Sequence, residues 1–142
     1  MSGLLSGLGG VFVFSENPGA LAEWYGRVFD LEFEGVGEQG SYYIFWSRSD
    51  RDPGRRLDTT FAVLPARGEL PRPPPDPDPQ DMYGDQAYMV NLRVEDMDRM
   101  LAHLDQQQVP VIGSQDEDYG RFVWVRDADG NRVELYQPLA SG

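Results

Sequence analysis

A strand-then-helix pattern occurs twice in this chain, and the second copy begins about 80 residues after the first. In the first copy, residues 11–14 form an apolar run typical of a strand, and residues 15–18 offer a capping side chain and a helix-starting proline. Apolar side chains then follow at the spacing of one buried helical face: Leu21, Trp24, Tyr25, Val28 and Phe29. We therefore expect a strand followed by a helix that ends near Asp30.

The second copy begins at Tyr88, where residues 89–94 alternate between apolar and polar side chains. Glu95 and Asp96 offer the helix cap, and a helical apolar stripe follows: Met97, Met100, Leu101 and Leu104. The helix is predicted to end at Val109, because the next residue is a proline, which disfavours helical geometry in the residue before it. We interpret the two copies as an internal repeat.

Each copy continues with segments of strand type: residues 41–48 and 59–64 in the first, and 120–125 and 132–137 in the second. The chain is thus predicted to be an α+β protein with two βαβββ modules, over residues 8–66 and 87–139, in one domain spanning residues 1–142. Residues 67–86 form the predicted connector. Its proline-rich part, residues 71–79, lacks the donors for a sheet and should be extended and solvated.

Composition removes several functional classes. The formal charge of −12 argues against a nucleic-acid partner, and the absence of cysteine excludes disulfides and thiolate ligands. Every basic residue is an arginine, which excludes Schiff-base chemistry on lysine. His103 is the only histidine. Residues 1–10 lack the basic start of a secretory leader and no apolar run could span a bilayer, so we expect a soluble cytoplasmic protein without a membrane partner.

The closing segment, residues 127–136, reads as a turn that leads into a strand. Asp129, Gly130 and Asn131 tolerate the backbone geometry of a tight turn. In the strand that follows, apolar residues alternate with Arg132, Glu134 and Tyr136, so that one face is apolar and the other carries polar chemistry. Glu134 is therefore the first candidate site residue.

The paired modules and the motif of residues 127–135 together resemble the vicinal oxygen chelate superfamily, which includes glyoxalase I, bleomycin-resistance proteins and extradiol dioxygenases. The resemblance extends from Gly10 to Pro138, and residues 119–122 are similar to a glyoxalase-like subgroup. For the fold, it implies two βαβββ units in a curled mixed sheet around a shared cleft. For assembly, it implies a homodimer.

The resemblance also implies one divalent metal held by the first and last strands of each module. The corresponding positions lie near Gly9, near Thr60 or Phe61, near Met89 and on Glu134. Of these, Glu134 is the residue that offers a suitable ligand atom, because methionine is a soft ligand and glycine and phenylalanine have no donor. We therefore expect no metal cofactor, with a divalent ion at Glu134 as the alternative. His103 should be an exposed or partly packed residue of the second helix.

Strand alternation predicts the remaining site residues. If Val90, Leu92 and Val94 pack under the helices, Asn91 and Arg93 face the cleft together with Glu134 and Tyr136. The competing interpretation is an Arg93–Glu134 ion pair with a structural role. Trp46, Trp124 and Arg121 are further predicted ligand contacts. The two tryptophans could instead belong to the core, and Arg121 could instead pair with Asp116, Glu117 or Asp118.

Three functional hypotheses follow. The first is a metal-free, dimeric binding protein for a small organic molecule. The acidic composition of the chain would favour a cationic ligand through long-range attraction. The second is a metal-dependent lyase, isomerase or dioxygenase with Glu134 as a metal ligand. The third is metal-free catalysis, with Glu134 as the general base and Arg93 or Tyr136 stabilising an oxyanion. We rank the binding protein first, and whether the chain is an enzyme stays open.

Overall fold

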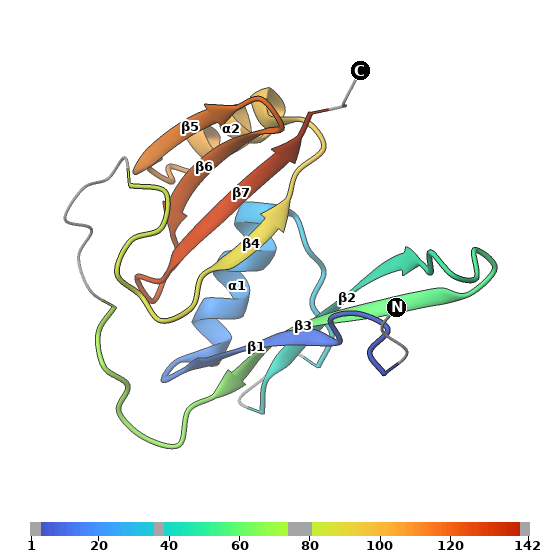
Figure 1. Ribbon diagram of the computed structural model, residues 1–142. Helices are drawn as coiled ribbons and strands as arrows, with labels where there is room; N and C mark the ends of the chain where they lie inside the picture. Colours follow the sequence, from blue (N-terminus) through green and yellow to red (C-terminus); the bar gives the residue numbers. More distant parts are fainter. Residues whose placement is uncertain (1–3, 36–38, 74–80, 140–142) are drawn as a thin grey trace. The chain divides into compact units, whose positions relative to one another are not determined.

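The computed structural model describes residues 4–35, 39–73 and 81–139. The chain divides into two compact units, the first formed by Met1–Gly26 and Leu31–Leu70 and the second by Arg27–Asp30 and Pro71–Gly142. A three-stranded and a four-stranded mixed sheet are present in the described ranges, each accompanied by a helix (Figure 1). The predicted α+β class with two modules is therefore confirmed.

The first unit contains β1 (Gly10–Ser15), α1 (Pro18–Phe29) as far as Gly26, β2 (Ser41–Arg48) and β3 (Arg56–Pro65). The strand order is β1-β3-β2, with β1 parallel and β2 antiparallel to β3. The helix begins where the sequence predicted, since the Asn17 side chain accepts a hydrogen bond from the Ala20 amide at 3.3 Å. An isolated bridge between Glu34 and Tyr42 extends the pairing beyond β2.

The apolar stripe of α1 forms the core of this unit. Leu21, Trp24 and Tyr25 are buried, and the Tyr25 ring lies 5.0 Å from the Phe61 ring of β3. Side chains along β3 alternate between the two faces of the sheet, and the face that carries Phe61 packs on the helix. The expectation that Trp24 belongs to the core is confirmed.

The second unit contains β4 (Val90–Arg93), α2 (Met97–Gln106), β5 (Gly113–Glu117), β6 (Gly120–Arg126) and β7 (Arg132–Pro138). This order is a complete βαβββ module, with strand order β4-β7-β6-β5 and β4 parallel to β7. Asp96 caps the helix by accepting a hydrogen bond from the Arg99 amide at 3.1 Å. The helix ends at Gln106, slightly before the predicted position, because Gln108 takes a left-handed conformation with φ of 59°.

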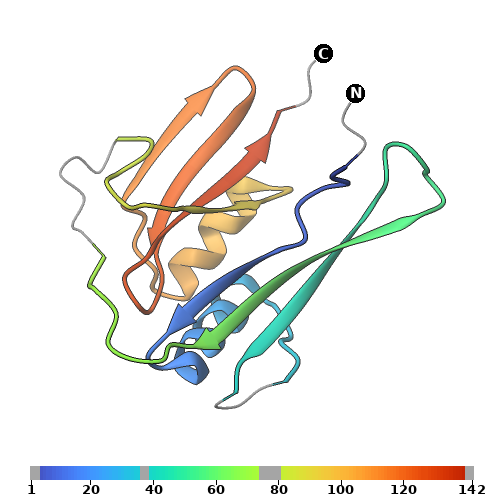
Figure 2. The same ribbon diagram turned by 60° about the horizontal axis from the view of Figure 1, so that its bottom comes forward.

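The α2 helix lies along one face of the four-stranded sheet (Figures 1 and 2). Its first amide, on Met97, donates to Gln137 Oε1 of β7 at 2.6 Å, and its Asp98 pairs with Arg121 of β6. Between helix and sheet lie the buried apolar side chains of the unit: Met97, Leu104, Val123, Val125, Val133 and Leu135. The opposite face of the sheet is therefore the one that can carry other chemistry.

Within the described ranges, neither helix has the length and apolar character needed to cross a bilayer. The proline-rich stretch predicted as an extended connector falls largely on residues 74–80, which lie outside the described residues. Residues 81–88, which follow it, lead into β4 and belong to the second unit.

Candidate functional site

Strand register places the candidate site on the sheet face opposite α2. Asn91 of β4, Glu134 of β7 and Trp124 of β6 are cross-strand partners, and therefore their side chains share one face. The next row along the strands does the same with Arg93, Tyr136 and Phe122. We call the surface formed by these two rows together with Tyr119 the aromatic–acidic face.

Glu134 is held at the centre of this face by two hydrogen bonds. Asn91 Nδ2 donates to Oε2 at 2.6 Å, and Trp124 Nε1 donates to Oε1 at 3.0 Å. The residue is 7% exposed, while Asn91 is exposed. A carboxylate has about four lone-pair positions, so two remain for a ligand. The geometry thus presents an oriented carboxylate with unused accepting capacity.

Trp124 is itself in contact with a charged side chain. It is fully buried, and the Arg132 guanidinium lies over its indole ring, with the guanidinium carbon 4.9 Å from the ring centroid. Arg132 Nη2 donates to the Asp81 carbonyl oxygen. Gly84 passes so close that a Cβ at this position would overlap Arg132 Nη1. The segment before β4 therefore packs against the Arg132 guanidinium.

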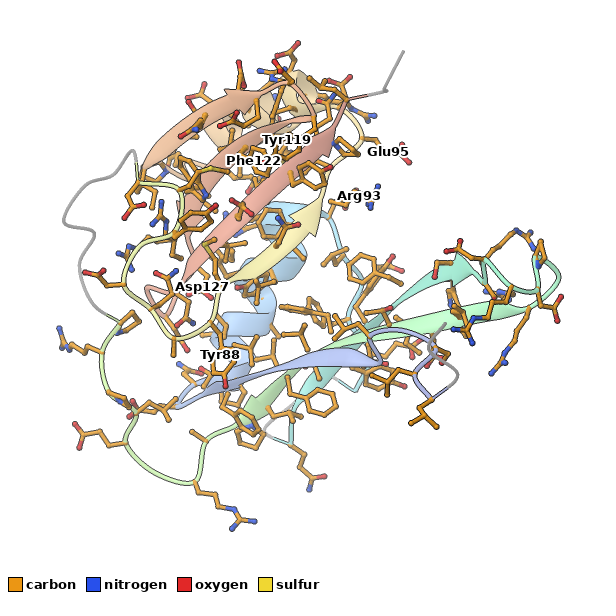
Figure 3. The ribbon with its side chains drawn as sticks, viewed as in Figure 1. Tyr88, Arg93, Glu95, Tyr119, Phe122 and Asp127 are labelled. Atoms are coloured by element: carbon orange, nitrogen blue, oxygen red, sulfur yellow. The ribbon has the colours of Figure 1, made fainter. Side chains whose placement is uncertain are left out.

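An aromatic row occupies the other end of the face. The Phe122 and Tyr136 rings are stacked, with centroids 5.0 Å apart and planes 16° from parallel. Tyr119 packs edge-on against Phe122 at 5.7 Å, and the Arg93 guanidinium lies 6.0 Å from the Tyr136 ring centroid. Figure 3 shows Tyr119 and Arg93 towards the same end of the sheet, and Asp127 at the opposite end.

The phenol of Tyr119 belongs to the same electrostatic environment as Glu134. Its pKa is raised, first by desolvation and then by the negative charge of Glu117, with smaller contributions from neighbours that include Tyr83 and Glu134. The phenol is therefore neutral near pH 7 and available as a hydrogen-bond donor. Aromatic rings, carboxylates and phenols thus lie together on one sheet face.

The β6–β7 turn sets the position of Glu134 along its strand. Asp127 Oδ1 accepts hydrogen bonds from the amides of Asp129 and Asn131, each at 2.9 Å, and Gly130 adopts a φ of 86°. This is the turn that the sequence predicted for these residues. Because it closes the hairpin in one register, it places Glu134 opposite Trp124.

Not all of the predicted site residues come together. Asn91, Glu134 and Trp124 form one hydrogen-bonded group, and Arg93 and Tyr136 form the neighbouring row. In place of an ion pair with Arg93, which was the competing interpretation, the carboxylate of Glu134 has the Asn91 and Trp124 side chains as its partners.

Two of the predicted residues lie elsewhere. Arg121 is on the α2 side of the sheet, where Asp98 holds it at 3.0 Å and Asp116 at 3.7 Å, so the salt-bridge interpretation describes its position. Trp46 belongs to the first unit and is 55% exposed, with the Arg56 guanidinium 4.1 Å from its ring centroid.

The residues present do not fit a divalent metal. Across the described parts of the chain, no group of three or more histidine, aspartate or glutamate side chains could hold an ion. Glu134 already accepts from two N–H donors, and its cross-strand partner Asn91 presents an amide nitrogen to it. Gly9 contributes a backbone carbonyl that accepts from the Thr60 amide. One carboxylate with such partners is a poor donor set for hard or borderline cations.

Three residues that shape this site were not among the predicted site residues: Arg132, Asp81 and Gly84. Alternation placed Arg132 on the same strand face as Glu134 and Tyr136, but gave it no role in the site. The other two lie in the segment that was assigned to the connector. Gly84 has a φ of 72°, and no local sequence pattern indicates that its backbone contacts Arg132, which is far away along the chain.

Comparison with known proteins gives one family match. Residues 7–135 match the Glyoxalase/Bleomycin resistance protein/Dioxygenase superfamily. Among curated proteins, no sequence match was found.

Three solved structures illustrate the structural likeness. A glyoxalase/dioxygenase from Nostoc punctiforme is 18% identical with a TM-score of 0.67, and the match covers 99% of this chain and 96% of that one. A lactoylglutathione lyase from Agrobacterium tumefaciens is 16% identical with a TM-score of 0.62, over 94% and 95% of the two chains. A glyoxylase/bleomycin resistance protein/dioxygenase domain from Frankia sp. EAN1pec is 18% identical with a TM-score of 0.56, over 95% and 99%.

At these identities the likeness to solved structures concerns the fold, whereas the sequence match spans nearly the whole chain and includes the β6–β7 turn and Glu134. The chain belongs to the Glyoxalase/Bleomycin resistance protein/Dioxygenase superfamily.

Proposed function

We propose that this protein binds a small organic cation on the aromatic–acidic face, with Glu134 as the anionic anchor and without a divalent metal. The observation that carries the proposal is the Glu134 carboxylate, which is nearly buried, fixed by Asn91 and Trp124, and still able to accept hydrogen bonds. An ammonium group offers N–H donors, from which such a carboxylate can accept hydrogen bonds.

The aromatic row supports the choice of a cation with an apolar body. Phe122 and Tyr136 provide stacked ring surface beside the carboxylate, and Tyr119 adds a neutral phenol. Aromatic faces attract cations, and flat apolar groups gain from contact with them. The formal charge of −12 adds long-range attraction for a cationic guest, which salt should weaken.

Calorimetric titration with benzylamine, which is protonated at neutral pH, tests the proposal, with benzyl alcohol as the neutral ligand of similar shape. We expect benzylammonium to bind and benzyl alcohol to bind at least about tenfold more weakly, equivalent to about 1.4 kcal/mol. Copper-free bleomycin is a larger cationic probe for the same site. Equal affinity for the charged and neutral ligands would contradict the role assigned to the carboxylate.

A matched pair of variants separates the site from general electrostatics. Glu134→Gln and Glu95→Gln remove the same charge from the same unit, but Glu95 is an exposed residue just after β4 (Figure 3). We expect Glu134→Gln to weaken benzylammonium binding about tenfold and Glu95→Gln to weaken it less than about twofold. A similar loss in both variants would show that net charge, and not the site, attracts the ligand.

Family membership favours one alternative, a metal-dependent lyase, isomerase or dioxygenase with Glu134 as a ligand. Elemental analysis of protein purified without chelators, for Glu134→Gln and the parent chain, decides between the two. A stoichiometric divalent ion in the parent chain that is lost in Glu134→Gln would replace the binding proposal with this one.

We also propose that the protein is a homodimer through the exposed face of the first sheet. Phe12, Phe14, Tyr42 and Trp46 project from the face opposite α1 and are all exposed. Adjacent exposed aromatic residues are typical of protein interfaces. Sedimentation equilibrium should give the dimer mass for the parent chain and the monomer mass for Phe12→Glu. A monomeric parent chain would contradict this assignment.

A further inference from the structure

We propose that Arg132 is a positioning residue that orients the Glu134 carboxylate through Trp124, and that residues 81–84 hold Arg132 in the required place. The inference rests on the proposed function only for its consequence on ligand binding. The contacts themselves all lie within the second unit.

The first step joins Arg132 to Trp124. The guanidinium stands 4.9 Å from the centroid of an indole that is fully buried, and Arg132 itself is 3% exposed. A desolvated cation–π contact of this kind is worth more than an exposed one, because water does not compete for the cation. The indole is thus held between the guanidinium and the neighbouring side chains, in one ring orientation.

The second step joins Trp124 to Glu134. The indole has a single N–H donor, which is directed to Glu134 Oε1 at 3.0 Å. A cation over the ring face withdraws electron density from the indole and strengthens this N–H as a donor. Rotation of the ring would break the hydrogen bond and leave Asn91 as the other partner of the carboxylate. The orientation of Glu134 therefore depends on the orientation of Trp124.

The third step joins residues 81–84 to Arg132. The Asp81 carbonyl oxygen accepts a hydrogen bond from Nη2, and the Gly84 backbone lies so close that an added Cβ would overlap Arg132 Nη1 and Gln86 Oε1. Gly84 also has a φ of 72°, which favours glycine. This segment lies shortly before β4, the strand that carries Asn91, which is the other hydrogen-bond partner of Glu134.

Glycine substitutions provide a matched experiment. Gly84→Ala places a methyl group against Arg132, whereas Gly35→Ala imposes the same backbone strain at a φ of 69° with its nearest neighbour at an ordinary 3.5 Å. The readout is the indole N–H resonance of Trp124 in a nitrogen-15 spectrum, identified as the peak that Trp124→Phe removes. A loss of stability alone would lower the melting temperature without moving this peak in the folded protein.

We expect Gly84→Ala to move the Trp124 peak upfield, as a weakened hydrogen bond does, and to reduce benzylammonium affinity about fivefold, or about 1 kcal/mol. Gly35→Ala should leave both unchanged. An unmoved peak in folded Gly84→Ala, or an equal movement in Gly35→Ala, would overturn the proposal. If the peak moves as expected but the parent chain binds no benzylammonium, the positioning role stands and the proposed function fails.

Arg132→Lys is the second variant, for the case in which Gly84→Ala does not fold. Lysine keeps the charge and the apolar stem but loses the planar group that stacks on the indole. We expect the same upfield movement of the Trp124 peak. A peak at the parent position would overturn the proposal. Failure of both Gly84→Ala and Arg132→Lys to fold, with Gly35→Ala folded, would also overturn it, because Arg132 would then determine folding instead of the orientation of Glu134.

Discussion

The hydrogen bond between Trp124 and Glu134 gives the most direct test of the site as described. Trp124→Phe keeps an aromatic ring in the buried position and removes the indole N–H that donates to Glu134 Oε1. A hydrogen bond to a charged group is worth about 1.5–3 kcal/mol, and Glu134 is buried enough for little discount. The smaller ring also leaves a space, which costs about 1–2 kcal/mol more. The total loss of unfolding free energy should be about 2.5–5 kcal/mol.

A double-mutant cycle isolates the hydrogen-bond part. Glu134→Met has a side chain of similar length without a charged acceptor, so in that background Trp124→Phe should cost only the packing part, about 1–2 kcal/mol. The coupling energy between the two positions is then about 1.5–3 kcal/mol. It is measured by urea unfolding of all four proteins, followed by far-ultraviolet circular dichroism because the variants differ in tryptophan content.

Trp46→Phe is the control for this cycle. Trp46 is 55% exposed and lies in the first unit, so its replacement should cost less than about 1 kcal/mol and show no coupling to Glu134→Met. A coupling energy below about 0.5 kcal/mol between Trp124 and Glu134 would refute the reasoning, because it would mean that the buried carboxylate does not depend on the indole donor.

Three further outcomes are expected. Asp127→Ala removes the acceptor of two turn amides and should lower the unfolding free energy by about 2–3 kcal/mol, measured by urea unfolding; a change below about 0.5 kcal/mol would contradict the turn's role. The raised pKa of Tyr119 means that folding favours the neutral phenol over the phenolate. The neutral phenol therefore contributes to stability below about pH 10, and this contribution is lost as the pH rises through the pKa of the folded state. Absorbance titration at alkaline pH should show a late-ionising phenol that Tyr119→Phe removes and that Glu117→Gln moves to lower pH; identical curves for the parent chain and Glu117→Gln would count against this cause. Arg121→Ala should cost at most about 1 kcal/mol in thermal unfolding, because its partner Asp98 is largely exposed, and should leave benzylammonium binding unchanged; a tenfold loss of binding would return Arg121 to the site.

Local patterns were sufficient for most of the secondary structure. The apolar stripes and caps of both helices, the apolar run of β6 and the alternation in β7 are properties of neighbouring residues, so they can be recognised without knowledge of the fold. The strand β5 was missed because residues 113–117 are polar and have no apolar alternation. Pairing with β6 at the sheet edge makes this segment a strand, and no local pattern indicates that pairing.

Side-chain alternation also carried part of the site. It places Glu134 and Tyr136 on one face of β7. The same alternation places Arg121 and Trp124 on opposite faces of β6, but it was not applied when both residues were assigned to the site. Parity cannot say which residue of a neighbouring strand stands opposite. That choice follows from register, which here makes Asn91 the partner of Glu134.

The sequence by itself determined the family, the two modules, most of the helix and strand positions and the orientation of the Glu134 carboxylate away from α2. These follow from short-range spacing, which each segment carries within itself. Only the tertiary structure decided that Glu134 is held by Trp124 and Asn91, that Arg121 pairs with Asp98, and that residues 81–84 pack on Arg132. Such contacts join residues far apart along the chain, so they exist only once the strands have paired and the helix has docked.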